Sequence, residues 1–407
     1  MNDESKSYVA NAILLSIFIT KNALFTYIIA AIRKLPLIGG ISFVIPPMAI
    51  LILGLISYRR SLLKYARISD ILIPLFLIIA VLITWLVYPQ NMPFFLYNYP
   101  NYIAYCLPAF IIGLTSTRYD ERMFRFISIV STISIVMSYL YTFLYLSTST
   151  YDELGQSYAV LPGTLFVIGY YIYSKKIIFL ISAIAGVVYA FMLGSRGPIL
   201  LILVFTCLGI LFINPSLSIK KASTVIVIFV AAYIFINSGA YVGVLLMARS
   251  LLAKYSISTR VIDFMISGRY VSYTSGRTDL YVKLLDILKE KPLLGYGLFG
   301  EWNYNGWNAH EIYLEVVFEY GWPLGVFMII WYLVKVIPTF FLEKEGHNRV
   351  FILVFITFVL IQGVMSYSHL RPELFLLLGF CLKQRRVQRF IKMESDHEQK
   401  KKSLYYI

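Results

Sequence analysis

The chain contains a succession of apolar runs, each close to the length that a membrane-crossing helix needs. Such a helix takes about 20 apolar residues to cross the ~30 Å hydrocarbon layer. The runs predict an all-α polytopic membrane protein with about 12 transmembrane helices. The run at 309–341 is too long for one span, so we expect its first part to lie outside the bilayer. The runs are 8–31, 37–57, 70–88, 101–116, 126–147, 158–174, 177–194, 198–213, 222–239, 309–341, 350–366 and 372–383.

The overall composition agrees with a membrane protein. Hydrophobic residues make up 59% of the 407 residues and charged residues only 14%, whereas a soluble domain carries about 25% charged residues. Mean hydropathy is +0.74. These values exclude a soluble enzyme and a disordered protein, and they argue against nucleic-acid binding as the reason for the net charge of +15.

The cysteines and the N-terminal segment carry no sign of a disulfide framework or a signal peptide. Cys106, Cys207 and Cys381 are far apart, each within an apolar run, and no CxxC pair or Cys/His cluster occurs. That pattern indicates neither a disulfide framework nor a thiolate metal site. The first residues lack a basic region and a small-residue cleavage site, so we interpret the first apolar run as a retained span.

Lysine and arginine are distributed unevenly between alternate loops, which predicts the orientation. Connections 58–69 and 117–125 and the C-terminal tail are rich in Lys and Arg, whereas loops 89–100 and 148–157 contain none. Basic loops stay in the cytoplasm, so both termini are predicted to be cytoplasmic. The predicted organisation is transmembrane helices 1–9 over 1–239, a large extracytoplasmic loop subdomain over 240–308, transmembrane helices 10–12 over 309–383, and a basic cytoplasmic tail over 384–407.

The long outer loop is predicted to be an ordered subdomain of short helices. Loops longer than about 12–15 residues are usually functional or disordered, and this one is not low in complexity. Leu280, Leu284, Leu285 and Leu288 have helical spacing after a Ser-Gly-Arg tripeptide, and Pro292 closes the run.

Three outer arginines are candidates for binding phosphate. Arg196 lies in Gly194-Ser-Arg-Gly-Pro198, a helix break at the predicted outer interface, where it could equally anchor to lipid headgroups. Arg269 and Arg277 each follow Ser-Gly, and a guanidinium pairs with phosphate oxygens in a bidentate fashion. A solvated charge is the alternative, above all for Arg269. Arg277 is favoured because Thr278 and Asp279 begin a helix whose N-terminus itself attracts an anion.

Aromatic residues gather near the end of the loop and suggest two roles. The segment holds Tyr296 between two glycines and, after it, Phe299, Trp302, Tyr304 and Trp307. Tryptophan and tyrosine collect at membrane interfaces, so an interfacial belt is one interpretation. A platform on which sugars stack is the other.

Acidic residues and one histidine mark the point where the loop re-enters the membrane. Glu311, Glu315 and Glu319 have i, i+4 and i+8 spacing, which would put like charges on one helix face and destabilise it. We therefore expect solvent, an arginine cluster or a polar substrate to lie opposite these three glutamates. His310 precedes the stripe, and Arg371 lies in the last outer loop. A lone histidine is more often structural than catalytic.

Together these segments resemble the Wzy-type O-antigen polymerase and O-antigen ligase superfamily. The resemblance covers residues 195–325, and the rest of the chain matches only as a multi-span scaffold. Two departures are Glu311, where the family usually has an amide after the motif histidine, and Gly325, which falls one residue late. The motifs are Ser195-Arg196-Gly197, Ser275-Gly276-Arg277-Thr-Asp-Leu280, Lys291-Pro-Leu-Leu-Gly-Tyr-Gly297 and His310-x-x-x-Leu314-x-x-x-x-Glu319-x-Gly321.

The resemblance implies a C-type glycosyltransferase-like fold in the bacterial inner membrane, with its active site on the periplasmic face. It implies a polysaccharide polymerase that moves a growing glycan from undecaprenyl pyrophosphate to the non-reducing end of a lipid-linked repeat unit of O-antigen or capsule. The implied partners are that lipid-linked oligosaccharide, the bilayer and a chain-length regulator protein. No DxD-like pair lies in an outer loop, so we predict a metal-independent enzyme without a cofactor.

The resemblance assigns roles within this set of residues. Arg196 and Arg277 would stabilise the departing diphosphate, with Arg269 behind them, because cations aimed at developing charge usually give the largest catalytic effect. His310, or else Glu311 or Glu315, would take the acceptor hydroxyl proton. The predicted substrate-binding residues are Arg269, Tyr296, Trp302, Trp307, Glu319 and Arg371.

Two other functions remain open. An O-antigen ligase, which transfers the glycan to lipid A core, would carry the same spans and motifs. A flippase for lipid-linked oligosaccharides would favour internal repeats and ionisable residues within spans. The chain shows no clear repeat and few mid-span charges, with Lys21 the main exception.

Overall fold

The computed structural model is helical throughout the part of the chain that it describes. That part comprises residues 12–20, 23, 67–101, 105–115, 119–145, 150–193, 196–213, 218–255, 259–267, 277–306, 309–366 and 371–404, and no strand occurs in it. The prediction of an all-α protein is thus confirmed. The predicted span at 37–57 lies outside the described residues.

The helices follow the order of the predicted apolar runs, with breaks that the runs did not mark. The first half contains α3 (Ile68–Val87), η1 (Pro89–Asn91), α4 (Met92–Asn101), α5 (Leu107–Thr115), α6 (Glu121–Tyr145), α7 (Thr150–Ser174), α8 (Ile177–Met192), α9 (Arg196–Phe212) and α10 (Ile219–Asn237). The second half contains α11 (Ala240–Lys254), α12 (Arg260–Ile266), α13 (Arg277–Leu288), α14 (Gly300–Asn305), α15 (Ile312–Leu342), α16 (Gly346–Phe355), the π-helical η3 (Ile356–Ile361), α17 (Gln362–Ser366) and α18 (Pro372–Leu404).

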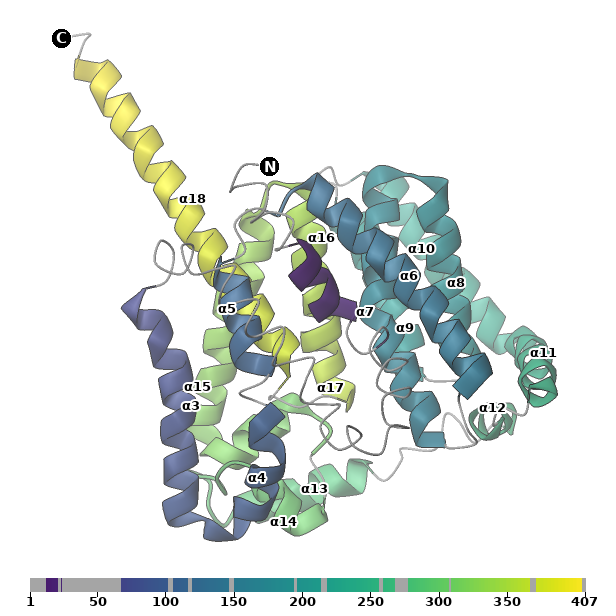
Figure 1. Ribbon diagram of the computed structural model, residues 1–407, viewed down its shortest axis with the longest axis horizontal. Helices are drawn as coiled ribbons and strands as arrows, with labels where there is room; N and C mark the ends of the chain where they lie inside the picture. The colour runs from purple at the N-terminus through teal and green to yellow at the C-terminus, as the bar shows by residue number, and fades with distance from the viewer. Residues whose placement is uncertain are drawn as a thin grey trace, which may run out of the picture.

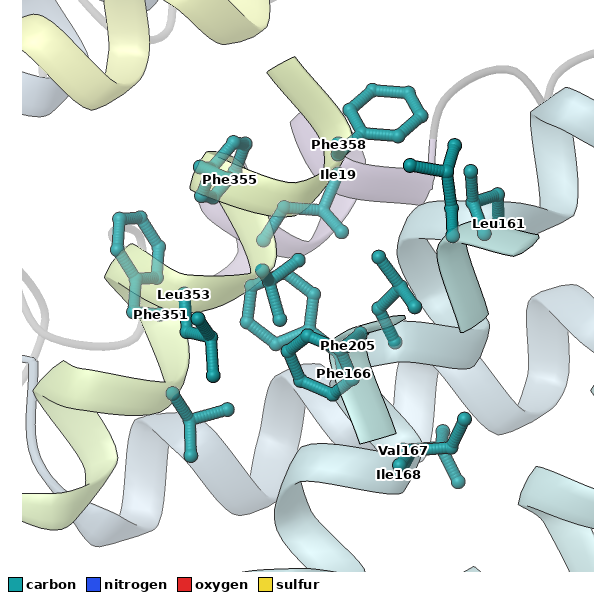
Figure 2. Close-up of a cluster of buried hydrophobic side chains, with 14 of the residues drawn as sticks. Ile19, Leu161, Phe166, Val167, Ile168, Phe205, Phe351, Leu353, Phe355 and Phe358 are labelled. Carbon is teal, nitrogen blue, oxygen red and sulfur yellow. The ribbon is translucent and has the colours of Figure 1, made fainter. Parts of the chain in front are cut away.

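Two groups of helices flank a central α16–α17 (Figure 1). Helices α6 to α10 lie together on one side, and α7 packs against α6, α8, α9 and α16. On the other side α18 packs along α5 and crosses α15. Phe166 of α7 meets Phe351 and Phe355 of α16 in the buried core, and Phe205 of α9 belongs to the same cluster (Figure 2).

The α5–α18 contact depends on two small residues. A Cβ added to Gly113 would lie 2.4 Å from the Leu376 carbonyl oxygen, and one added to Gly379 would lie 2.5 Å from that of Phe110. Small residues allow helix backbones to approach this closely in membranes. Beyond this contact α18 continues as one helix through the predicted tail and projects from the body (Figure 1).

Three described helical segments are long and apolar enough to cross a membrane, namely Glu121–Phe143, Ile312–Leu342 and Gly346–Val364. The number rises to five if each of two bent pairs counts as one span. Helices α8 and α9 are apolar but shorter. The predicted count of about 12 spans and the C-type fold stay predictions.

The described residues of the predicted loop subdomain form four helices, α11 to α14. Helix α13 runs from Arg277 to Leu288, as the leucine spacing predicted, and Leu284 and Leu288 are fully buried. Helix α15 has non-helical backbone at Gly321 (φ 77°, ψ 166°). This kink divides the long run into a short first part, which meets α13 and α14, and a longer second part.

Candidate functional site

His310 stands at the junction between the loop subdomain and α15. Its backbone is left-handed (φ 58°), which is uncommon for a residue other than glycine and tends to occur at functional sites. The next residue, Glu311, caps α15: its carboxylate accepts hydrogen bonds from the backbone N–H groups of Tyr313 at 3.1 Å and Leu314 at 2.5 Å. The cap satisfies N–H groups that a helix start leaves open, and it fixes the direction in which the half-buried His310 meets the loop.

Charged side chains from three parts of the chain act on His310. Burial lowers the pKa of its imidazole, and the positive charge of Arg277 lowers it further, while Glu315 raises it and Arg371 lowers it. The structure therefore brings together four of the residues singled out in the sequence, from α13, α15 and the start of α18. A lowered pKa favours the neutral imidazole, which is the form that accepts a proton.

Tyr281 belongs to this group as well, although its position in the sequence suggests no chemical role. It lies one turn after Arg277 on α13. Burial raises the pKa of its hydroxyl, Arg277 lowers it and Glu311 raises it. The phenol of Tyr281 thus lies close enough to Arg277 and Glu311 to interact with their charges. The only signal in the sequence was its i+4 spacing from Arg277.

The loop between Gly295 and Phe299 is held in place by groups far away in sequence. The Tyr88 hydroxyl donates to the Gly295 carbonyl at 2.8 Å. The Asn91 amide, fully buried on η1, donates to the carbonyls of Tyr296 and Leu298, both at 2.9 Å. Satisfied buried amides of this kind rigidify a site, and only the fold brings Asn91 here.

Two motif glycines explain how the loop approaches α15. Gly295 has φ 65° and Gly321 has φ 77°. A Cβ on Gly295 would lie 2.5 Å from the Gly321 nitrogen, and one on Gly321 would lie 2.3 Å from the Leu293 carbonyl oxygen. Only glycine fits both the backbone angles and the spacing. These glycines let the loop pack against the α15 kink.

The predicted stacking aromatics pack against protein. Tyr296 is 4% exposed, its ring stacks on Phe318 at 4.8 Å, and Tyr304 meets it edge-on. Its hydroxyl donates to the Ile287 carbonyl at 2.8 Å. Trp302 is half-buried against Phe94. These contacts assign both rings to the packing of the loop, and their contact with substrate stays a prediction.

Three carboxyl groups are buried together behind the loop. Glu301 of α14 and Glu315 and Glu319 of α15 each place an oxygen within 4.8 Å of the others. Burial raises the pKa of Glu301 well above its usual value, and the negative charge of Glu315 raises it further. Glu319 accepts a hydrogen bond from the Phe299 N–H at 2.6 Å.

The acidic stripe predicted from sequence therefore has two parts. Its first member, Glu311, caps the helix. The other two meet Glu301 in the interior, and Glu301 gave no signal in the sequence because it lies on a different helix. Like charges this close cannot all ionise, so the group shares protons or holds a cation. A substrate contact for Glu319 stays a prediction.

Of the remaining predicted residues, the structure describes only the backbone of Arg196, which starts a helix. Arg196 is the first residue of α9, and Gly197 after it lies against the Tyr158 hydroxyl of α7. The side chain of Arg196, and all of Arg269 and Trp307, lie outside the described residues. Their roles stay predictions.

Comparison with known proteins agrees with the family that the motifs resemble. Residues 177–329 match the family model described as O-antigen ligase. Over these residues the chain is similar to the O-antigen ligase family. It runs from α8 to the part of α15 beyond the kink, so it contains Arg196, Arg277 and His310, and it is consistent with the O-antigen polymerase and ligase superfamily. No curated protein and no solved structure matches the chain.

Proposed function

We propose that the protein is a membrane polysaccharide polymerase, which transfers a growing glycan from undecaprenyl pyrophosphate to the non-reducing end of a lipid-linked repeat unit. The observation that carries the proposal is a half-buried His310 with left-handed backbone before α15, in a segment that matches the O-antigen ligase model. Burial and the charges of Arg277 and Arg371 lower the pKa of its imidazole. A base beside cations suits the transfer of a sugar from a diphosphate.

In the proposed reaction the acceptor hydroxyl oxygen forms a bond to the anomeric carbon of the donor glycan. The bond between that carbon and the diphosphate oxygen breaks, and its electron pair leaves with the diphosphate. The acceptor proton passes to the imidazole of His310. Arg277 and Arg371, together with Arg196, stabilise the charge that develops on the leaving group. The diphosphate is itself a good leaving group, so this mechanism needs no metal ion.

Among the three candidate bases, the geometry favours His310. Glu311 uses its carboxylate to cap α15, and Glu315 is fully buried. His310 is half-buried and carries a lowered pKa. General-base catalysis of this kind typically accelerates a reaction about 10²–10⁴-fold.

The second candidate is an O-antigen ligase, which the description of the matching family model favours. It would use the same residues on the same donor and differ only in the acceptor, lipid A core. The products of the reaction distinguish a polymerase from a ligase. A polymerase turns a lipid-linked repeat into a ladder of longer lipid-linked glycans, and a ligase leaves the repeat unextended until lipid A core is added.

The test uses purified protein with a synthetic lipid-linked repeat. We expect a ladder from the wild type and a loss of about 10²-fold or more in rate for His310→Ala. His347→Ala is the control, because His347 is half-buried against Tyr119 at the start of α16. Wild-type chain lengths from His310→Ala would remove it as the base. Movement of the lipid-linked repeat across vesicles without extension would indicate a flippase.

A further inference from the structure

An apolar cavity of about 650 Å³ opens between α3, α15 and α18. The volume is within the ~300–1,000 Å³ range of sites that bind small molecules. Its walls are hydrocarbon and aromatic side chains, including Phe76, Phe327, Trp331 and Leu378. Phe327 is 62% exposed, so one wall is open to whatever surrounds the helices.

One end of this cavity is strongly basic. Five of the described residues that line it are cationic, one is acidic, and all six lie where α3 begins, α15 approaches its end and α18 enters the predicted tail. They are Arg67, Lys335, Arg385, Arg386, Arg389 and Asp70. By the predicted orientation this end faces the cytoplasm.

The basic end is built and held in place by specific contacts. Arg386 forms a two-bonded ion pair with Asp70, at 2.7 Å for one of the bonds, which ties α18 to α3. Arg385 donates to the Thr339 hydroxyl at 2.8 Å and to the Val334 carbonyl at 2.5 Å, which ties α18 to α15. Arg67 and Arg389 are exposed at the same end. The positive charge is therefore ordered around the cavity mouth.

We propose that this cavity binds an anionic phospholipid of the cytoplasmic leaflet, with an acyl chain between α3, α15 and α18 and the headgroup phosphate at the arginines. Leu324 and Lys335, both lining the cavity, are separated on α15 by about 16 Å at ~1.5 Å per residue. That stretch nearest the arginines is about half of the ~30 Å hydrocarbon layer, which is the depth of one leaflet, and beyond it the cavity lining continues to Tyr313 near the start of α15.

The arginines decide between the two lipids that could occupy an apolar cavity. A polyprenyl tail that entered from the His310 side would bring hydrocarbon, not an anion, to the basic end. A phospholipid phosphate supplies the acceptor oxygens that guanidinium groups pair with. The general excess of basic residues on the cytoplasmic side does not explain why five cations line this cavity. Arg122 and Arg125 belong to the same predicted cytoplasmic side and are exposed on α6, but they do not line the cavity.

Native mass spectrometry of the full chain, delipidated in detergent, tests the proposal. The probes are phosphatidylglycerol and phosphatidylcholine with matched acyl chains, and undecaprenyl phosphate as competitor. We expect the wild type to retain phosphatidylglycerol selectively. Arg67→Ala combined with Arg389→Ala should weaken binding about thirtyfold, because each basic residue near an anionic membrane surface strengthens binding about five- to sixfold. Arg122→Ala with Arg125→Ala removes the same charge and should change nothing.

A second variant tests the apolar part of the cavity without touching its charges. Leu324→Trp fills the cavity from a position that is 39% exposed, so the fold tolerates it, and bound phosphatidylglycerol should be lost. Four results would overturn the proposal: no retained lipid in the wild type, equal retention of phosphatidylcholine, equal loss in both arginine pairs, or displacement by undecaprenyl phosphate. Because no glycan is involved, the outcome is independent of the proposed transfer reaction.

Discussion

At the scale of single residues, the imidazole of His310 links the electrostatics of the site to pH. Burial and the charge of Arg277 lower its pKa below the usual value of about 6.5. A base works only when deprotonated, so activity should be full near neutral pH and fall as the pH drops through that lowered pKa. Arg277→Gln removes one cause of the shift, so the acid limb of the profile should move to higher pH.

The measurement is kcat/KM for ladder formation against pH, in the wild type and in Arg277→Gln. Lys289→Gln is the control, since it removes a positive charge from an exposed position just after α13. A lower rate with an unmoved acid limb would mean that Arg277 stabilises the leaving group without acting on His310. An acid limb that moves equally in Lys289→Gln would contradict a specific effect of Arg277 on the pKa of His310.

The carboxyl of Glu301 supplies a second prediction at this scale. Its folded pKa is raised by burial and by Glu315, so the folded protein binds the proton more tightly than the unfolded chain does. Its contribution to stability is full below the unfolded pKa of about 4.3 and is lost as pH rises toward the folded value. Glu301→Gln keeps the neutral form permanently, so its Tm should exceed the wild-type Tm by a few degrees near pH 8 and match it near pH 4.

The same variant separates proton sharing from metal binding by Glu301, Glu315 and Glu319. A cation held by the three carboxylates would make Glu301→Gln less stable than the wild type, and EDTA would lower the wild-type Tm. Without a bound cation, EDTA leaves both the Tm and the ladder unchanged. Loss of the ladder in EDTA, with recovery in Mg²⁺, would contradict the metal-independent mechanism.

At the scale of elements, the contact between the loop and the α15 kink depends on glycine. Gly321→Ala would place a Cβ 2.3 Å from the Leu293 carbonyl oxygen at a backbone angle that side chains avoid. We expect a loss of about 2–5 kcal/mol of stability and loss of the ladder, because this contact follows directly after the part of α15 that begins beside His310 and carries Glu319. Thermal unfolding in detergent measures the first effect.

Gly306→Ala is the matched control for that substitution. Its φ of 75° is nearly the same, but nothing lies within 4 Å of the added Cβ. Only the conformational cost of about 1–2 kcal/mol should remain. Equal destabilisation by the two substitutions would mean that the backbone angle, and not the close contact with Leu293, sets the requirement for glycine.

What the sequence predicts at this scale is local, and what it misses is contact between distant segments. The leucine spacing predicted α13, since a helix follows from periodicity. The excess length of the 309–341 run predicted a first part outside the bilayer, which stays a prediction, and it did not reveal the kink at Gly321. The spacing of Glu311, Glu315 and Glu319 was visible, but their partners were not. Glu301 meets two of them from a separate helix, and Asn91 reaches the loop from more than 200 residues away. The spacing of residues within one segment does not show which residues of a distant segment contact it.

At the scale of the whole molecule, α15 connects the two regions on which the proposals rest. Its N-terminal end carries Glu311 and follows His310, and its other end approaches the basic mouth of the cavity. Tyr313 lines the cavity two residues after the cap. One helix therefore borders both the proposed site of transfer and the proposed lipid, on opposite predicted faces of the membrane.

That arrangement requires the two ends of α15 to be on opposite sides of the bilayer, which cysteine labelling can test. Lys289→Cys lies before α15, in the predicted outer loop, and Lys344→Cys follows it, in a predicted cytoplasmic connection; both positions are exposed. The native Cys106, Cys207 and Cys381 are buried, so the background should be low. A membrane-impermeant maleimide added to spheroplasts should label Lys289→Cys at once and Lys344→Cys only after permeabilisation. Labelling of both from outside would overturn the orientation, and with it the assignment of the basic end of the cavity to the cytoplasmic leaflet.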